Sequence, residues 1–163
     1  SSGRAPGSPH ERALATGCLE FIESRLLDAQ GLVADHLRAD GSVDVAVYTY
    51  NQGLAIGLMG ALGRAVDARA LGMRVMDEFG ADRLWAHPPA FNGILVRELM
   101  SVPRGDAAFD ARAHAFCTDY LERAWTTARR PDGLMRAGGI GSYDSGHVLD
   151  HAALVGAMAA MGR

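Results

Sequence analysis

The sequence predicts an all-α fold built from helical hairpins. Six stretches of the chain carry apolar residues at helical spacing, and each begins at a residue type that favours a helix start. Segments rich in glycine or proline separate these stretches, and no charge run or low-complexity tract divides the chain. We therefore expect a single helical domain over residues 9–163. Residues 1–8 are small and polar, as in a tag remnant, a linker or a disordered start.

Helix-start signals and apolar stripes define the first three predicted helices. Ser8 to Glu11 has the spacing of a capping box with proline at the first helical position, which predicts a helix from about Pro9 to Leu27. Thr49 to Gln52 repeats this spacing and begins the second helix, and Asp67 caps a third that stops at Gly80. The stripes expected to face the core are Leu14, Cys18, Phe21, Ile22 and Leu26 in the first helix, Leu54, Leu58, Ala61, Leu62 and Ala65 in the second, and Leu71, Val75 and Phe79 in the third.

Three further helices follow from the same signals. Pro88-Pro89 opens the fourth, which Pro103 ends; Asp106 caps the fifth, which continues to Pro131; and Ser145 caps the sixth. The stripes expected to face the core are Phe91, Ile94, Leu95, Leu99 and Val102, then Phe109, Ala113, Phe116, Tyr120 and Ala124, and finally Val148, Ala152, Val155 and Ala159.

Two local features interrupt this helical pattern. Between Asp28 and Tyr48, an alternating run from Val43 to Val47 follows Asp40-Gly41, which predicts a small β-hairpin. Gly53, Gly57 and Gly60 give the second helix a face of small residues. Since each internal glycine costs about 1 kcal/mol, we expect another backbone or a ligand to approach this face closely.

Composition excludes several classes of function. The net charge is −3, so the chain has no overall attraction for nucleic acid, and all of its basic residues apart from histidine are arginine, which excludes lysine-based chemistry. The longest apolar run, Gly53 to Gly63, is far shorter than the roughly 20 residues of a membrane span. Cys18 and Cys117 are expected to be buried thiols, since both lie on apolar helical faces. The composition does not assign the chain to a cellular compartment.

Two strings in the sequence carry a family resemblance. Tyr48-Thr49-Tyr50-Asn51-Gln52-Gly53 resembles the T-Y-N-Q-G signature of glycoside hydrolase family 76, the endo-α-1,6-mannanase family. Gly31 to Asp35 looks like the G-L-V-x-D loop that precedes this signature in the family. Phe91 to Arg97 is similar to its F-K-G-I-F-V-R helix, with Asn92 where lysine is usual. The resemblance extends over essentially the whole chain.

The resemblance implies an (α/α)6 toroid of twelve helices. The six helices expected here would form about half of that ring and resemble its C-terminal half. The family's retaining mechanism requires two adjacent aspartates in the N-terminal half, and this sequence has no Asp-Asp pair. Its adjacent acids Asp77-Glu78 match no family motif and suit a solvated helix face. We therefore predict no catalytic residue here, no hydrolysis of α-1,6-mannan by this chain alone, and a ring completed by the missing half or by a second chain.

The resemblance, together with side-chain chemistry, gives a set of candidate substrate-binding residues. Hydroxyl, amide and aromatic groups at a helix start suit the hydroxyls and ring faces of a mannan oligosaccharide. Arg97 either pairs with a carboxylate or binds a sugar hydroxyl, Trp85 either stacks on a sugar or packs in the core, and Asp35 either faces substrate or ends a turn. The full set is Tyr50, Asn51, Gln52, Asp35, Trp85 and Arg97. No cofactor and no metal are predicted.

Two other interpretations stay open. His147 and His151 share a helix face with Asp150 between them, which is similar to an inverted zinc-peptidase motif, but no acid, histidine or cysteine follows as a third ligand. Alternatively, the chain is a non-catalytic helical-repeat interaction module, in which exposed small-residue faces bind a peptide or a partner helix. Half of a ring would leave apolar faces uncovered, which predicts self-association of the isolated chain.

Overall fold

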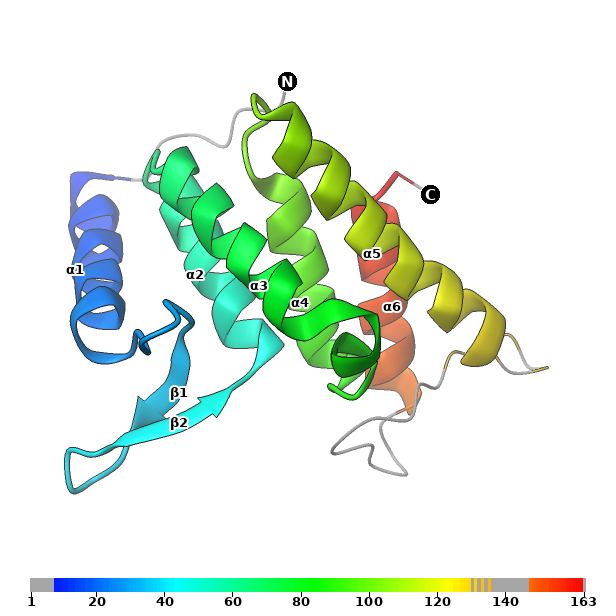
Figure 1. The fold of residues 1–163 in the computed structure, drawn as a ribbon, viewed down its shortest axis with the longest axis horizontal. Coiled ribbons are helices and arrows are strands. Elements are labelled where there is room, and N and C mark those ends of the chain that lie inside the picture. Colours follow the sequence, from blue (N-terminus) through cyan, green and yellow to red (C-terminus); the bar gives the residue numbers. More distant parts are fainter. Residues whose placement is uncertain (1–7, 130, 132, 134, 136–146, 163) are drawn as a thin grey trace.

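The computed structural model describes residues 8–129, 131, 133, 135 and 147–162. It confirms a mostly helical fold with one small β-hairpin, and the closed ring stays a hypothesis (Figure 1). The elements are α1 (Pro9–Arg25), β1 (Ala34–Leu37), β2 (Val43–Val47), α2 (Thr49–Ala61), α3 (Ala65–Trp85), α4 (Pro89–Ser101), α5 (Ala107–Thr127) and α6 (His147–Ala160).

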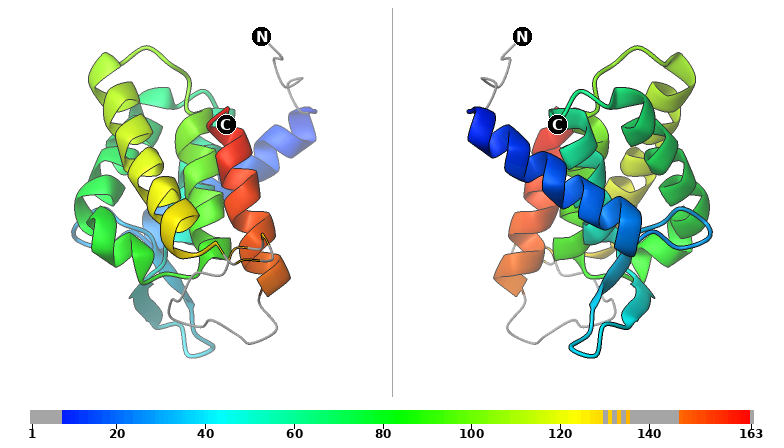
Figure 2. Two further views of the ribbon diagram at one scale, coloured as in Figure 1. Left: turned by 90° about the vertical axis from the view of Figure 1, so that its right-hand side faces the viewer. Right: turned by 90° about the vertical axis from the view of Figure 1, so that its left-hand side faces the viewer.

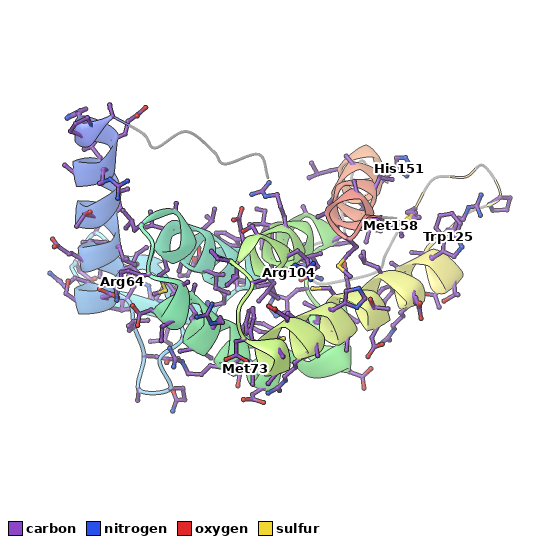
Figure 3. All side chains as sticks on the ribbon, turned by 90° about the horizontal axis from the view of Figure 1, so that it is seen from above. Arg64, Met73, Arg104, Trp125, His151 and Met158 are labelled. Carbon is purple, nitrogen blue, oxygen red and sulfur yellow. The ribbon has the colours of Figure 1, made fainter. Side chains whose placement is uncertain are left out.

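Five of the helices form two rows: α2, α4 and α6 make up the first row, and α3 and α5 make up the second. α4 lies between α2 and α6 and packs against both, while α3 packs against α2 and α5 (Figure 3). α2, α4 and α6 run in one direction, and α3 and α5 run in the opposite direction (Figure 1). α1 crosses the other helices obliquely at one side of the molecule (Figure 2). The starts of α2, α4 and α6, together with the β-hairpin, therefore lie at the same end of the molecule.

The three helices of the first row share a packing pattern. The fourth residue of each is polar and buried: Gln52 in α2, Asn92 in α4 and Asp150 in α6. The fully buried apolar residues recur at the same later positions, as in Ile56, Val96 and Leu154. Because the pattern repeats while the residue types change, these helices occupy equivalent places in a stacked array of hairpins.

Glycine sets the distance between neighbouring helices in this row. A Cβ atom on Gly53 would lie 2.9 Å from the Leu95 Cα atom in α4, and a Cβ atom on Gly93 would lie 3.0 Å from the Ala153 carbonyl oxygen in α6. The expectation that another backbone approaches the small face of α2 is confirmed at Gly53, whereas a Cβ atom on Gly60 would meet no atom within 4 Å.

The predicted hairpin is present, and its strands are antiparallel. Ala34 pairs with Val47 and Leu37 with Val43, and the ladder is irregular between Ala34 and His36. Gly41 lies in the connecting turn with a φ of 83°, a left-handed conformation that glycine adopts without steric cost.

Several predicted helix ends are confirmed and others are wrong. The Ser8–Glu11 capping box is present, and the Asp106 side chain accepts from the backbone amides of Ala108 and Phe109. Neither Thr49 nor Asp67 is a cap, because α2 and α3 begin after Tyr48 and Arg64, which make no side-chain cap hydrogen bond. At Gly80 (φ 49°) the backbone is non-helical, so α3 consists of two helical segments that meet at a kink, and the predicted stop falls at this break. The predicted cap Ser145 lies outside the described residues.

The expected core faces are right in three helices and wrong in three. The stripes of α3, α4 and α5 are buried or half-buried, as predicted. In α1, α2 and α6, part of the predicted stripe is exposed, because the neighbouring helix contacts another apolar face. The exposed residues are Leu14, Cys18 and Phe21 in α1, Leu54 and Ala61 in α2, and Ala152, Val155 and Ala159 in α6. The residues buried instead include Leu19, Ile56 and Leu154.

The two thiols differ. Cys117 is buried as predicted, and its burial raises the pKa of the thiol to about 12, whereas Cys18 is exposed, contrary to the prediction. No helix within the described ranges is long and apolar enough to span a membrane.

Candidate functional site

The buried amide of Gln52 joins the start of α2 to the chain before β1. Its Oε1 atom accepts from the Val33 backbone N–H at 2.9 Å, and its Nε2 atom donates to the Val33 carbonyl at 2.7 Å and to the Tyr48 carbonyl at 3.2 Å. The side chain is fully buried, so these bonds use groups that water does not reach. Gln52 therefore positions the site and does not face solvent, where a substrate would bind.

This attachment places Asp35 next to the first turn of α2. The Tyr50 hydroxyl donates to Asp35 Oδ1 at 2.6 Å, and the Asn51 amide donates to the same oxygen at 2.9 Å. His36 Nδ1 lies 2.8 Å from Asp35 Oδ2. The Asp35 side chain keeps 18% of its surface exposed, and Tyr50 and Asn51 are half-buried. Three of the predicted site residues, Asp35, Tyr50 and Asn51, thus form one polar cluster.

Hydrogen bonding sets the ionisation of this cluster. The Tyr50 hydroxyl, followed by smaller contributions from His36 and Asn51, holds the pKa of the Asp35 carboxyl below its ordinary value, against the opposing effect of burial. Burial and the neighbouring Asp35 charge raise the pKa of Tyr50. At neutral pH the cluster therefore holds an ionised carboxylate, a protonated phenol and a neutral amide, and these can donate to and accept from the hydroxyls of a ligand.

Aromatic rings lie beside the polar cluster. The Tyr50 ring stacks on Tyr48 with centroids 6.0 Å apart and contacts Phe91 at 4.6 Å. His87 meets Tyr48 edge-on at 6.1 Å and is partly buried, and its burial lowers the pKa of the imidazole. Sequence reasoning did not assign Tyr48, His87 or Phe91 to the site. Tyr48 and Phe91 lie within the quoted motifs, which could have indicated them, whereas nothing around His87 points to this place.

A second buried amide holds the aromatic side of the cluster. Asn92 donates to the carbonyls of Leu84 and His87 at 2.8 and 3.2 Å, and its Oδ1 atom accepts from the Thr49 hydroxyl at 2.9 Å. These bonds join α4 to the last turn of α3, to the loop between α3 and α4, and to the first residue of α2. Asn92 therefore contributes structure, since it holds three segments of the chain together.

The other two predicted site residues lie away from these contacts. The Trp85 ring lies 5.9 Å from the Tyr120 ring and beneath the Arg123 guanidinium at 4.6 Å, so these contacts belong to the packing of α3 on α5. Arg97 makes an ion pair with Glu98 at 2.7 Å and lines a shallow hollow between α4 and α6. No contact of Trp85 or Arg97 with the Asp35 cluster occurs among the described residues.

The zinc interpretation gains no support from the described residues. Within the described ranges, no group of three or more histidine, cysteine or acidic side chains could hold a metal ion, and the His147 side chain lies outside the part that is described. Asp77 pairs with Arg112 and Glu78 with Arg83, so this acidic pair lies on a solvated helix face, as predicted.

Comparison with known proteins adds no assignment. No family model, no curated protein and no solved structure matches this chain.

Proposed function

We propose that the surface around Asp35, Tyr50 and Asn51 binds a neutral oligosaccharide, and that its ligand is an α-1,6-linked mannoside. The observation that carries this proposal is the convergence of the Tyr50 hydroxyl and the Asn51 amide on a single, partly exposed Asp35 oxygen. The resemblance of residues 48–53 to the family 76 signature supplies the sugar class.

The chemistry of the cluster fits a sugar better than it fits a charged ligand. A neutral oligosaccharide presents hydroxyl groups and weakly apolar ring faces, so its site needs donors, acceptors and an aromatic plane on rigid elements. Asp35 supplies acceptors, Asn51 and Tyr50 supply polar groups, and the adjoining aromatic rings supply apolar surface. Two buried amides fix these groups to the first turns of α2 and α4.

Binding, and not hydrolysis, is the role that this surface supports. Retaining glycoside hydrolysis uses two carboxyl groups about 5–5.5 Å apart, one as nucleophile and one as acid and base. Among the described residues, the hydrogen-bond partners of the Asp35 carboxylate are Tyr50, Asn51 and His36, and none of them is a second carboxylate. An Asp35 with a lowered pKa is also unsuited to donate a proton at neutral pH.

Titration calorimetry with α-1,6-mannobiose tests the proposal. We expect Asn51→Ala to weaken binding by up to about tenfold, because a hydrogen bond to a neutral ligand contributes about 0.5–1.5 kcal/mol. The matched control is Gln30→Ala, which removes an exposed amide from the turn before β1 and should leave the affinity unchanged.

Two results would contradict the proposal. One is the absence of measurable heat with wild-type protein at saturating disaccharide. The other is equal affinity of the wild-type and Asn51→Ala proteins, since that would remove Asn51 from the contact surface. Circular dichroism of both variants checks that the helical content is retained.

A further inference from the structure

A second group of polar side chains lies beside the Asp35 cluster, around His87. This histidine belongs to the loop between α3 and α4, and its ring meets the Tyr48 ring edge-on with centroids 6.1 Å apart. Both side chains are half-buried. Within the described ranges the His87 ring contacts Tyr48 and Phe79 but not Tyr50, so Tyr48 lies between His87 and the polar cluster.

The polar atoms of His87 and Tyr48 are accessible. Among the described residues, neither the His87 ring nitrogens nor the Tyr48 hydroxyl makes a hydrogen bond. The buried polar side-chain atoms without a partner in this part of the chain belong instead to Tyr120 and His151. The His87 nitrogens and the Tyr48 hydroxyl therefore reach the surface, where a ligand can bind them.

The surroundings of His87 keep its imidazole neutral at pH 7. Burial, followed by the positive charge of Arg83, lowers the pKa of His87 from the ordinary value of 6.5. A neutral imidazole has one nitrogen that donates and one that accepts. Arg83 itself pairs with Glu78, so it adds no uncompensated charge. These properties suit a sugar hydroxyl, which also donates and accepts, better than they suit an anionic group.

Packing and backbone hydrogen bonds hold His87 in place. Its ring lies edge-on against the Phe79 ring at 5.0 Å, and Phe79 is part of the buried core. Its carbonyl accepts from the Asn92 amide at 3.2 Å, and its backbone N–H donates to the Leu84 carbonyl at 3.1 Å. Because His87 is already ordered, a ligand that binds it loses little affinity to side-chain or loop ordering.

An aromatic surface connects His87 to the Asp35 cluster. The Tyr48 and Tyr50 rings are stacked, with centroids 6.0 Å apart and planes inclined by 22°, and His87 adjoins the Tyr48 end of this pair. Stacked rings of this kind offer an extended plane for the weakly apolar faces of successive sugar rings.

We propose that Tyr48 and His87 form a second sugar subsite, which binds the unit next to the one held at the Asp35 cluster. In this subsite the Tyr48 ring contacts the sugar face and the His87 imidazole binds a hydroxyl. The inference rests on the proposed sugar binding and adds a length requirement. A single mannose unit uses the Asp35 cluster alone, whereas a disaccharide uses both subsites.

NMR titrations with α-methyl mannoside and α-1,6-mannobiose test the second subsite. The wild-type protein should bind the disaccharide more tightly. His87→Ala should weaken disaccharide binding by about threefold to tenfold and leave monosaccharide binding unchanged, because it removes one hydrogen bond to a neutral ligand. His87→Gln keeps a donor and an acceptor and should retain part of the preference. The matched control, His114→Ala, removes an exposed histidine of α5 and should change neither affinity.

A measurement on the wild-type protein needs no substitution: the imidazole signals of His87 should shift with the disaccharide and not with the monosaccharide. The inference is overturned if the wild type binds both ligands equally well, or if His87→Ala leaves the ratio of the two affinities unchanged. A loss of both affinities by the same factor would also overturn it, since a purely structural role has that effect. Absence of binding of either ligand to the wild type would instead contradict the proposed function, and the second subsite with it.

Discussion

At the scale of single residues, the neighbouring amides Asn51 and Gln52 have different roles. Gln52 is fully buried and satisfies both backbone groups of Val33, whereas Asn51 is half-buried and donates to the Asp35 side chain. The sequence assigns both to substrate contact, because side-chain chemistry alone does not reveal burial. Gln52 therefore holds the chain before β1 against α2, and Asn51 is the amide to which we assign the proposed ligand contact.

We expect Gln52→Ala to lower the free energy of unfolding by about 2–4 kcal/mol, since it leaves buried backbone groups unpaired and opens a cavity. Asn51→Ala should cost about 1 kcal/mol or less, because water can replace its bond. Urea unfolding of both variants measures the difference. Equal losses in the two variants would show that Gln52 is not the residue that attaches Val33 to α2.

The Tyr50–Asp35 hydrogen bond makes stability depend on pH. A carboxyl whose pKa is lowered on folding stabilises the protein above its unfolded pKa of about 3.9, and this contribution is lost as the pH falls through the folded value. Tyr50→Phe removes the largest cause of the lowered pKa. The variant should therefore lose less stability than the wild type between about pH 5 and about pH 2.

Urea unfolding across this pH range measures the effect. Tyr48→Phe is the control, since the Tyr48 hydroxyl is not among the groups that lower the pKa of Asp35. Parallel pH profiles for the wild-type and Tyr50→Phe proteins would contradict the assignment.

At the scale of single elements, the small face of α2 explains how closely α2 and α4 pack. The sequence predicts that another backbone or a ligand approaches this face, because glycine inside a helix is otherwise unfavourable. The structure identifies the α4 backbone near Leu95 as the neighbour of Gly53. Two glycines in one helix thus have opposite surroundings: Gly53 is enclosed, and Gly60 faces open space.

Alanine substitutions at Gly53 and Gly60 test this difference in surroundings. Gly53→Ala should lower the free energy of unfolding by about 1–3 kcal/mol, because the added Cβ atom would overlap the α4 backbone. Gly60→Ala should raise it by up to about 1 kcal/mol, because alanine favours the helix and meets no neighbour. Thermal unfolding of the two variants gives the signs. A stabilising Gly53→Ala would contradict the close packing of α2 on α4.

Helix existence was predictable from the sequence, whereas the face each helix buries was predictable only in part. Caps such as Ser8 and Asp106 are local, and both are confirmed. Which face of a helix is buried, in contrast, depends on the helix that packs against it. α6 has apolar or small residues on several sides, so its periodicity does not distinguish Val155, which is exposed, from Leu154, which is buried.

At the scale of the whole molecule, parallel starts of the first-row helices place the candidate site at one end of the array, beside the hairpin (Figure 1). Asp35 lies in β1 and Tyr50 in α2, with only β2 between them along the chain, and both belong to the motif strings, so their proximity could be anticipated. His87 lies beside Tyr48 because Asn92 holds the α3–α4 loop through the His87 carbonyl. No local sequence pattern indicates this contact.

An NMR titration of the ¹⁵N-labelled chain with α-1,6-mannobiose tests the proposed sugar site most directly. We expect saturable shifts of the backbone amides of Asp35, His36, Tyr50 and Asn51, with no change at the Trp125 indole, since Trp125 lies on α5, outside the cluster. A disaccharide of α-1,4-linked glucose serves as the control for sugar class and should cause weaker shifts at the same amides. No shifts at saturating mannobiose, or shifts confined to residues outside the Asp35 cluster, would contradict the proposal.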